Sequence, residues 1–188
     1  WGRGITPIWI ASHYSILKKE FEVKLFDSTF YENWTENELE YNTQNKQYLK
    51  TQYSEKITYN KKNIFDELQK EVDSFNPDVI FWSALSSHIH GEGEYVNIQY
   101  GHELVNKINT HGSILVTGGL QATASPELIL KKYPKINYLI SGESEFVLLE
   151  IMRNLENKSK LDKINGLNFF DKGVFLKNQK QKIISDLD

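Results

Sequence analysis

Residues 114–145 constrain the fold of this chain more than any other part of the sequence. An apolar segment at 114–116 runs into a Thr-Gly-Gly turn, and a second apolar segment at 138–140 runs into Ser-Gly-Glu. Between them lies a helix start at 125–127, where serine serves as N-cap, proline suits the first helical position and glutamate favours the positive end of the helix dipole. Two strands joined by a helix form a right-handed crossover and are therefore parallel.

The two glycine turns lie where parallel sheets bind ligands, beyond the carboxyl ends of the strands. Gly118, Gly119 and Gly142 can adopt positive φ and let a ligand approach the backbone closely. Ordinary tight strand-to-helix turns would explain the same glycines, so a binding site is a hypothesis at this point.

The remainder of the chain alternates helix and strand in the same way. Apolar side chains recur at helical spacing in four further segments, and short apolar runs mark two further strands. The tail at 164–184 alternates like a β-hairpin that turns at 171–173. These patterns predict an α/β fold, a doubly wound parallel sheet in flavodoxin-like order with a C-terminal β-hairpin extension. The further helices are predicted at 8–20, 64–75, around 101–108 and at 146–155, and the further strands at 23–26 and 79–82.

The predicted organisation is one α/β domain over residues 1–160 and a hairpin connector over 161–188. A polar insertion at 31–62 interrupts the first part and is given a short helix around 38–49. Its aromatic residues could cover a ligand or pack against the domain. We expect the first strand of such a fold to precede the turn at 1–4, so that it is missing from this sequence.

The composition is that of an ordinary globular protein and excludes several classes of function. Charged residues make up 25% of the 188 residues, the net charge is -3, and no apolar run approaches the ~20 residues that span a bilayer. We therefore expect a cytoplasmic domain with neither nucleic acid nor a membrane as partner. The absence of cysteine excludes disulfides, zinc ribbons, thiol nucleophiles and iron-sulfur ligation within these residues.

The order and spacing of several short motifs resemble one family. The Gly-Gly tract that continues into Ala-Thr at 122–123, the Pro-Glu helix start and the Gly-Glu-Ser-Glu turn at 142–145 are similar to the cobalamin-binding domain that precedes the radical SAM domain in many cobalamin-dependent radical SAM enzymes. Asn137 stands where that family usually has Asp. The resemblance covers most of the chain apart from residues 28–62. Its outer parts are the segments 6–11, 22–27, 77–80, 166–167 and 185–188.

The resemblance implies that this domain binds cobalamin for a larger parent enzyme. The parent would transfer a methyl group to an unreactive carbon of a small molecule, or rearrange it, as a methyltransferase-like radical SAM enzyme does. S-adenosylmethionine and a 4Fe-4S cluster would belong to the parent's own downstream radical SAM domain, which is the expected partner of this one. These 188 residues alone would not be catalytic.

The implied cobalamin cradle consists of small and polar residues in three loops at one edge of the sheet. A corrin ring carries many amide arms, so backbone groups, hydroxyls and glycines suit it better than strong charge. No catalytic residue is expected among them. The predicted cofactor-binding residues are Ser83, Ser86, His88, Gly118, Gly119, Gln121, Ala122, Thr123, Gly142 and Glu143.

No metal site is predicted, and the cobalt has no firm ligand. Cobalamin domains of the methionine synthase type use Asp-x-His-x-x-Gly after the first strand, and this chain lacks that motif. His88 has the His-x-x-Gly spacing, but Ser86 replaces the Asp and the loop follows another strand, so His88 is only a weak candidate. His13 lies in the first helix with no Asp in register. His88 and His90 also resemble the first two ligands of amidohydrolase-type metal sites, but no later strand offers another His.

Two other functions remain open. The domain could be a ligand-free scaffold that only docks on the radical SAM barrel. It could also be a nucleotide- or flavin-binding protein, although no phosphate loop is visible and Asp27 lacks a Gly-x-Gly-x-x-Gly before it. Glu143 and Glu145 could form an acid/base pair, but they are explained more simply as partners of a helix N-terminus.

Overall fold

The structure is a computed structural model that describes residues 8–28, 31–33, 60–83 and 96–179. The chain divides into two compact units. The larger unit consists of Trp1–Val23, Pro77–Asn106 and Thr110–Asp188, and the smaller unit of Lys24–Asn76 and Lys107–Asn109.

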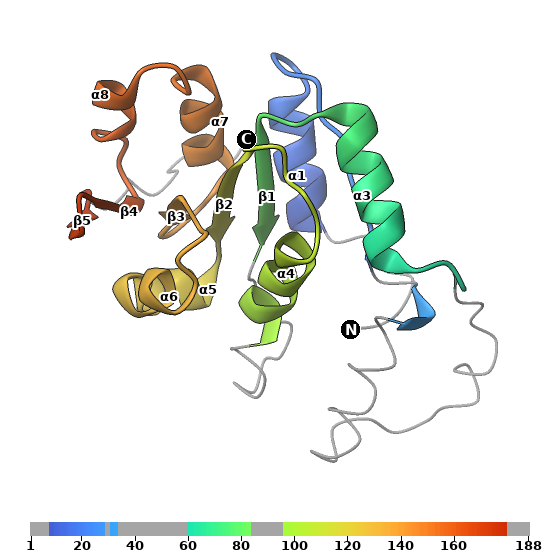
Figure 1. Ribbon diagram of the computed structural model, residues 1–188. Coiled ribbons are helices and arrows are strands. Elements are labelled where there is room, and N and C mark those ends of the chain that lie inside the picture. Colours follow the sequence, from blue (N-terminus) through green and yellow to red (C-terminus); the bar gives the residue numbers. More distant parts are fainter. Residues whose placement is uncertain (1–7, 29–30, 34–59, 84–95, 180–188) are drawn as a thin grey trace. The chain divides into compact units, whose positions relative to one another are not determined.

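The larger unit is built on a five-stranded sheet (Figure 1). Its strands lie in the order β1-β2-β3-β4-β5. The first three are parallel, whereas β4 and β5 run antiparallel to their neighbours. This arrangement confirms the predicted α/β fold with a parallel sheet and a C-terminal hairpin. The strands are β1 (Val79–Ser83), β2 (Ile114–Gly118), β3 (Tyr138–Ile140), β4 (Leu167–Asp171) and β5 (Val174–Lys177).

Helices cover both faces of this sheet, as the doubly wound prediction requires. On one face Val116 and Ile140 pack with Leu17, Leu148 and Ile151. On the other face Leu139 packs with apolar side chains of the opposite helix layer. The first face is covered by α1 (Ile8–Leu17), α7 (Glu145–Arg153) and α8 (Lys158–Leu161), and the second by α4 (Val96–Asn106), α5 (Leu120–Ala124) and α6 (Pro126–Lys132).

Two elements differ from the sequence prediction. The strand predicted at 23–26 is wrong, because residues 22–28 have no regular secondary structure. A strand requires a hydrogen-bonded neighbour, and the described residues supply none here. Residues 120–124 form the short helix α5, which the apolar periodicity did not reveal because the segment makes little more than one turn. The insertion's predicted helix at 38–49 lies outside the described residues.

The hairpin closes with a two-residue turn. Lys172 and Gly173 have φ of 47° and 82°, the pair of positive values that a type I′ turn needs. The hairpin continues the sheet through the pairs Leu139↔Asn168 and Ile140↔Leu167. Leu167 has no exposed surface, so the hairpin contributes to the core. The boundary predicted at residue 160 stays a prediction.

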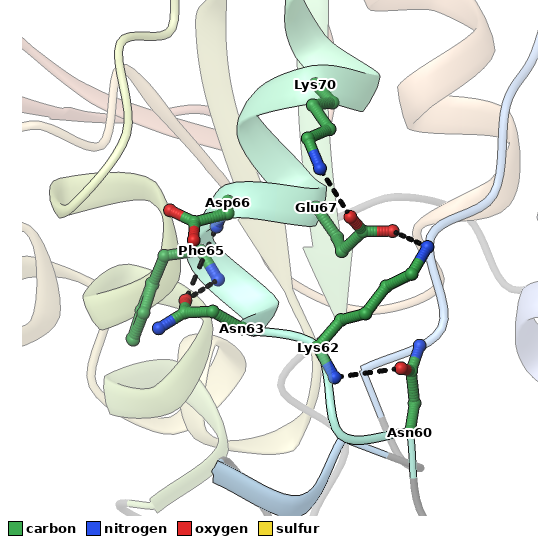
Figure 2. Close-up of polar contacts among 7 residues, drawn as sticks. All are labelled: Asn60, Lys62, Asn63, Phe65, Asp66, Glu67 and Lys70. Carbon is green, nitrogen blue, oxygen red and sulfur yellow. Dashed lines mark hydrogen bonds and ion pairs between the residues drawn. The ribbon is translucent and has the colours of Figure 1, made fainter.

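The smaller unit is described mainly by its helix α3 (Ile64–Phe75), which the sequence predicted. Asn63 caps it, because its Oδ1 accepts from the N–H groups of Phe65 and Asp66 at 2.9 and 3.4 Å (Figure 2). Glu67 in the first turn pairs with Lys62 and Lys70. The hydrogen bond from Lys70, then that from Lys62, lowers the pKa of Glu67. Among the described helices of the whole chain, none is long and apolar enough to cross a membrane.

Candidate functional site

The ends of β1, β2 and β3 lie level with one another. Ser83 pairs with Gly118, and Gly118 pairs with Ile140. The segments that leave β2 and β3 therefore start side by side at one edge of the sheet (Figure 1). We call this edge, with residues 118–124 and 141–145, the carboxyl edge. It brings together two of the three predicted loops, while the third, at 84–95, lies outside the described residues.

Packing favours glycine at the end of β2. A Cβ on Gly118 would lie 3.3 Å from the Cβ of Ser144 and 3.4 Å from that of Ile140, which is closer than ordinary contact. Gly119 has a φ of 123°, where a side chain is strained. Gly142, with φ of 91°, differs because a Cβ there would meet no atom of the described residues within 4 Å. The backbone of Gly142 is therefore open on that side.

Thr123 connects the two glycine turns. Its Oγ1 donates to the carbonyl oxygen of Gly119 at 2.9 Å and accepts from the N–H of Gly142 at 2.8 Å. The helix α5 places this hydroxyl, since the N–H of Thr123 also donates to the Gly119 carbonyl at 3.0 Å. One side chain thus sets the spacing between the turn after β2 and the turn after β3.

A buried amide connects the turn after β3 with the hairpin. The Nδ2 of Asn168 donates to the Oγ of Ser141 at 2.9 Å and to the carbonyl oxygens of Leu139 and Gly166 at 3.0 and 3.1 Å. Asn168 is 1% exposed. Its Oδ1 has no hydrogen-bond partner in the described structure. The two N–H groups of the amide therefore serve three acceptors that all belong to the β3–β4 junction.

His13 contacts the same turn from the α1 side of the sheet. Its Nε2 lies 2.7 Å from the Oγ of Ser144, and its Nδ1 lies 4.0 Å from the Oε1 of Glu145. The imidazole stacks on Phe81, with 5.1 Å between ring centroids. His13 is 7% exposed and Ser144 is 8% exposed. A polar pair is thus enclosed where α1 packs on the start of α7.

The predicted cofactor-binding residues divide into three groups. Gly118, Gly119, Thr123, Gly142 and Glu143 lie at the carboxyl edge, where Glu143 is exposed. Three others offer no described side chain to a ligand. Ala122 is fully buried in the core, and for Ser83 and Gln121 only the backbone is described, in β1 and α5. Ser86 and His88 lie outside the described residues, so their roles stay predictions.

Two residues that contact the carboxyl edge, His13 and Asn168, were not assigned to it by the sequence analysis. The partners of His13 and Asn168 lie 131 and 27 positions away along the chain, so no local pattern could reveal them. The one available signal was a polar residue inside an apolar face, His13 in the first helix and Asn168 beside buried Leu167 and Phe169.

A separate hollow of about 420 Å³ lies toward the amino end of β3. Its two lysines, Lys131 and Lys158, are paired with Glu127 and Asp171. Burial is the main cause that raises the pKa of Tyr138 there. Within the described residues, no group of three or more potential ligands could hold a metal ion. The hollow is lined by Leu130, Lys131, Pro134, Ile136, Asn137, Tyr138, Lys158, Phe169 and Phe170.

Comparison with known proteins finds relatives that are longer than this chain. No family model matches. The chain is 25% identical over 124 residues to an uncharacterised methyltransferase of Pyrococcus horikoshii, covering 66% of this chain and 26% of that protein. It is 32% identical over 75 residues to the anaerobic magnesium-protoporphyrin IX monomethyl ester cyclase of Synechocystis sp., covering 40% of this chain and 15% of the cyclase. The chain thus spans 26% or less of the length of these relatives.

A solved structure shares the fold over the whole chain. The radical S-adenosylmethionine methyltransferase TsrM of Kitasatospora setae, in a structure with cobalamin and a [4Fe-4S] cluster bound, matches with a TM-score of 0.62 at 14% identity. The match covers 100% of this chain and 28% of TsrM. At this identity the match establishes the fold, and it confirms the flavodoxin-like arrangement predicted from the sequence. The predicted resemblance is also confirmed, because the similar proteins include a cobalamin-containing radical SAM enzyme.

Proposed function

We propose that this chain is the cobalamin-binding domain of a cobalamin-dependent radical SAM enzyme. The observation that carries the proposal is the open backbone of Gly142 beside the strained Gly119 turn, both held in register by the Thr123 hydroxyl. Two fixed, glycine-lined turns at the carboxyl ends of parallel strands form the place where such sheets bind ligands. The TsrM structure with cobalamin bound supports the choice of ligand, and the methyltransferase relative supports the reaction class of the parent.

The chemistry of this edge suits a large, neutral ligand that is rich in amides. Its groups are mainly backbone amides and hydroxyls; of its two carboxylates, Glu143 is exposed to solvent and Glu145 lies beside His13. The ring would contact the backbone at 118–119 and 142–143, with Ser83, Ser86, His88, Gln121 and Thr123 around it. Ala122 would support the edge indirectly, as a small residue packed in the core. When bound, cobalamin supplies a cobalt centre that carries a methyl group; the residues of this chain hold and orient it.

The remaining parts of the proposal concern the parent protein. Its methyl transfer or rearrangement would use S-adenosylmethionine and a 4Fe-4S cluster on a radical SAM domain that follows this one. That domain would be the main partner, a small molecule the substrate, and the cytoplasm the setting. A Cys-x-x-x-Cys-x-x-Cys soon after Asp188 in the natural protein is the expected sequence mark of that domain.

A pair of glycine variants tests the ligand site. Gly142 and Gly112 both have positive φ, 91° and 85°, and in the described part of the chain a Cβ on either would meet no atom within 4 Å. Alanine therefore adds similar backbone strain at both positions, but only Gly142 lies at the carboxyl edge. We expect hydroxocobalamin to bind the natural protein, with a Kd about tenfold higher in Gly142→Ala than in Gly112→Ala, equivalent to about 1.4 kcal/mol.

Visible absorbance of hydroxocobalamin titrated with each purified protein gives the three dissociation constants, and circular dichroism shows that the variants are folded. Equal affinity in the two variants would place the ligand elsewhere. No binding by a folded natural protein would favour the second candidate, a ligand-free domain that docks on the radical SAM domain.

A further inference from the structure

His13 is a polar residue at a position where an apolar one would be expected. It lies in α1, near Leu17, which is buried in the core beneath the first face of the sheet. A buried imidazole loses its hydration and needs a hydrogen-bond partner in return. The structure supplies one from another helix, the Oγ of Ser144 at 2.7 Å, directly before α7 begins.

The imidazole of His13 contacts three side chains, and these contacts direct it to Ser144. Phe81 of β1 stacks on one side of the imidazole and fixes its plane. The carboxylate of Glu145 lies 4.0 Å from Nδ1 and favours the tautomer with the proton on that nitrogen, so that Nε2 accepts from the Ser144 hydroxyl. Ser144 has no side-chain hydrogen bond to the helix that it precedes. Its hydroxyl is therefore directed to α1.

The turn after β3 is consequently fastened from both faces of the sheet. Thr123 of α5 accepts from the N–H of Gly142, and Asn168 of β4 donates to Ser141. His13 holds Ser144 at the other end of the same turn. The hydroxyls of Thr123, Ser141 and Ser144 are all engaged within the protein. What this turn offers to a ligand is the backbone of residues 142–143.

We propose that His13 is a positioning residue for the turn after β3, residues 141–145. It fixes Ser144, and through Ser144 the backbone of residues 142–143, in the conformation that accepts the ligand. The inference rests on the proposed function and adds to it a residue that does not touch the ligand. A hydrolytic role for the neighbouring Ser144, His13 and Glu145 does not fit, because Ser144 and His13 are only 8% and 7% exposed and a substrate could not reach them.

Four variants of the natural protein test the role of His13. His13→Leu keeps the volume and removes the hydrogen bond, whereas His13→Gln can restore it through an amide placed near the Nε2 position. Ser144→Ala removes the same bond from the other partner with a smaller change. Leu17→Ala is the matched control, because it weakens the buried packing of α1 without touching the turn.

Two measurements are made on each variant: amide hydrogen exchange at 142–145 without ligand, and the Kd for hydroxocobalamin. We expect His13→Leu and Ser144→Ala to raise both by about fivefold, the factor that corresponds to the loss of one buried hydrogen bond of about 1 kcal/mol. The double variant should change little beyond either single one, since both remove one interaction. His13→Gln should recover most of the loss, and Leu17→Ala should leave exchange in the turn slower than His13→Leu does.

Unchanged exchange in both His13→Leu and Ser144→Ala would overturn the proposal. So would equal exchange in the turn of Leu17→Ala and His13→Leu at matched thermal stability, because general loosening of α1 would then explain the effect. If the natural protein does not bind hydroxocobalamin, the proposed function fails. In that case the exchange data still decide whether His13 holds the turn.

Discussion

At the scale of single residues, two opposing effects decide how alanine at Gly118 changes the free energy of unfolding. Its φ is not positive, so alanine would restrict the unfolded chain and add about 0.4–1 kcal/mol to the free energy of unfolding. Against this, the new Cβ would press on Ser144 and Ile140 at 3.3 and 3.4 Å, and overpacking costs about 1–3 kcal/mol. We expect Gly118→Ala to lower the free energy of unfolding by about 1 kcal/mol in urea denaturation. A net gain would show that Ser144 moves aside freely.

Thr123 is the second residue whose role can be isolated. Valine has the same shape but lacks the hydroxyl, so Thr123→Val leaves the Gly142 N–H without its partner, while the Gly119 carbonyl keeps the backbone N–H of Thr123. We expect a loss of about 1 kcal/mol in unfolding free energy and faster amide exchange at Gly142. Thr123→Ser keeps the hydroxyl and serves as the control. If both variants exchange alike, the hydroxyl does not hold the turn.

Residues that act through local backbone geometry could be read from the sequence. The sequence alone points to Gly118, Gly119 and Gly142, because a glycine after a strand has a local meaning that needs no partner, whereas Thr123 was predicted from the family resemblance. His13 depends on a contact that only folding creates, and its helix gave no pattern that separates a positioning histidine from a surface one. The loop of Ser86 and His88 remains a prediction.

At the scale of elements, the contact between α4 and β1 depends on a missing side chain. Gly101 lies mid-helix, where glycine costs about 1 kcal/mol relative to alanine. A Cβ at this position would overlap the indole ring of Trp82. Although helix propensity favours alanine, we expect Gly101→Ala to lower the melting temperature. Adding Trp82→Leu should recover part of the loss, and a melting temperature above the natural one in the single variant would contradict the steric argument.

His102 on α4 should make the stability of this layer depend on pH. Its ring packs against Tyr133, with 4.5 Å between ring centroids. Burial, followed by the charge of Lys135, lowers the pKa of His102 below 6.5. The unfolded chain therefore takes up a proton first as the pH falls, and stability decreases from about pH 6.5 down to the lowered folded pKa.

We expect the melting temperature to decrease less between pH 7 and pH 5 in His102→Gln than in the natural protein. The comparison of the two slopes cancels the contribution of the carboxylates, which titrate in both proteins. Parallel slopes would mean that His102 is equally accessible to protons in the folded and unfolded states.

Strands and helices of the larger unit were predicted well where one segment carries its own pattern. The helix start at 125–127 combined cap, proline and glutamate, and α6 begins at Pro126 as expected, although the side chain of Ser125 makes no capping hydrogen bond. The strand expected at 23–26 shows the limit of prediction from a single segment. A strand needs a hydrogen-bonded neighbour, and the sequence of the segment itself does not show whether that neighbour is present. The helix α5 shows another limit, since five residues are too few for a helical period to appear.

At the scale of the whole molecule, the hairpin determines where the folded unit ends. Leu167 is fully buried, Phe169 is 3% exposed, and Asn168 bonds to the β3 turn. We expect a protein truncated after residue 160 to lose its cooperative thermal transition. The core that packs against α7 would lose the buried side chains of Leu161, Leu167 and Phe169. A truncated protein that unfolds as sharply as the natural one would support the boundary predicted at that point.

The bonds around the hairpin also form a path for mechanical load. The carbonyl of Gln179 accepts from the N–H of Gly166, and the carbonyl of Gly166 accepts from the N–H of Ser141, next to Gly142. Tension applied to the chain at residue 179 would therefore pass through two hydrogen bonds in series to the glycine turn, without needing to cross the core. A displacement of residue 179 would therefore reach the turn at 141–142, where this domain is proposed to hold its ligand.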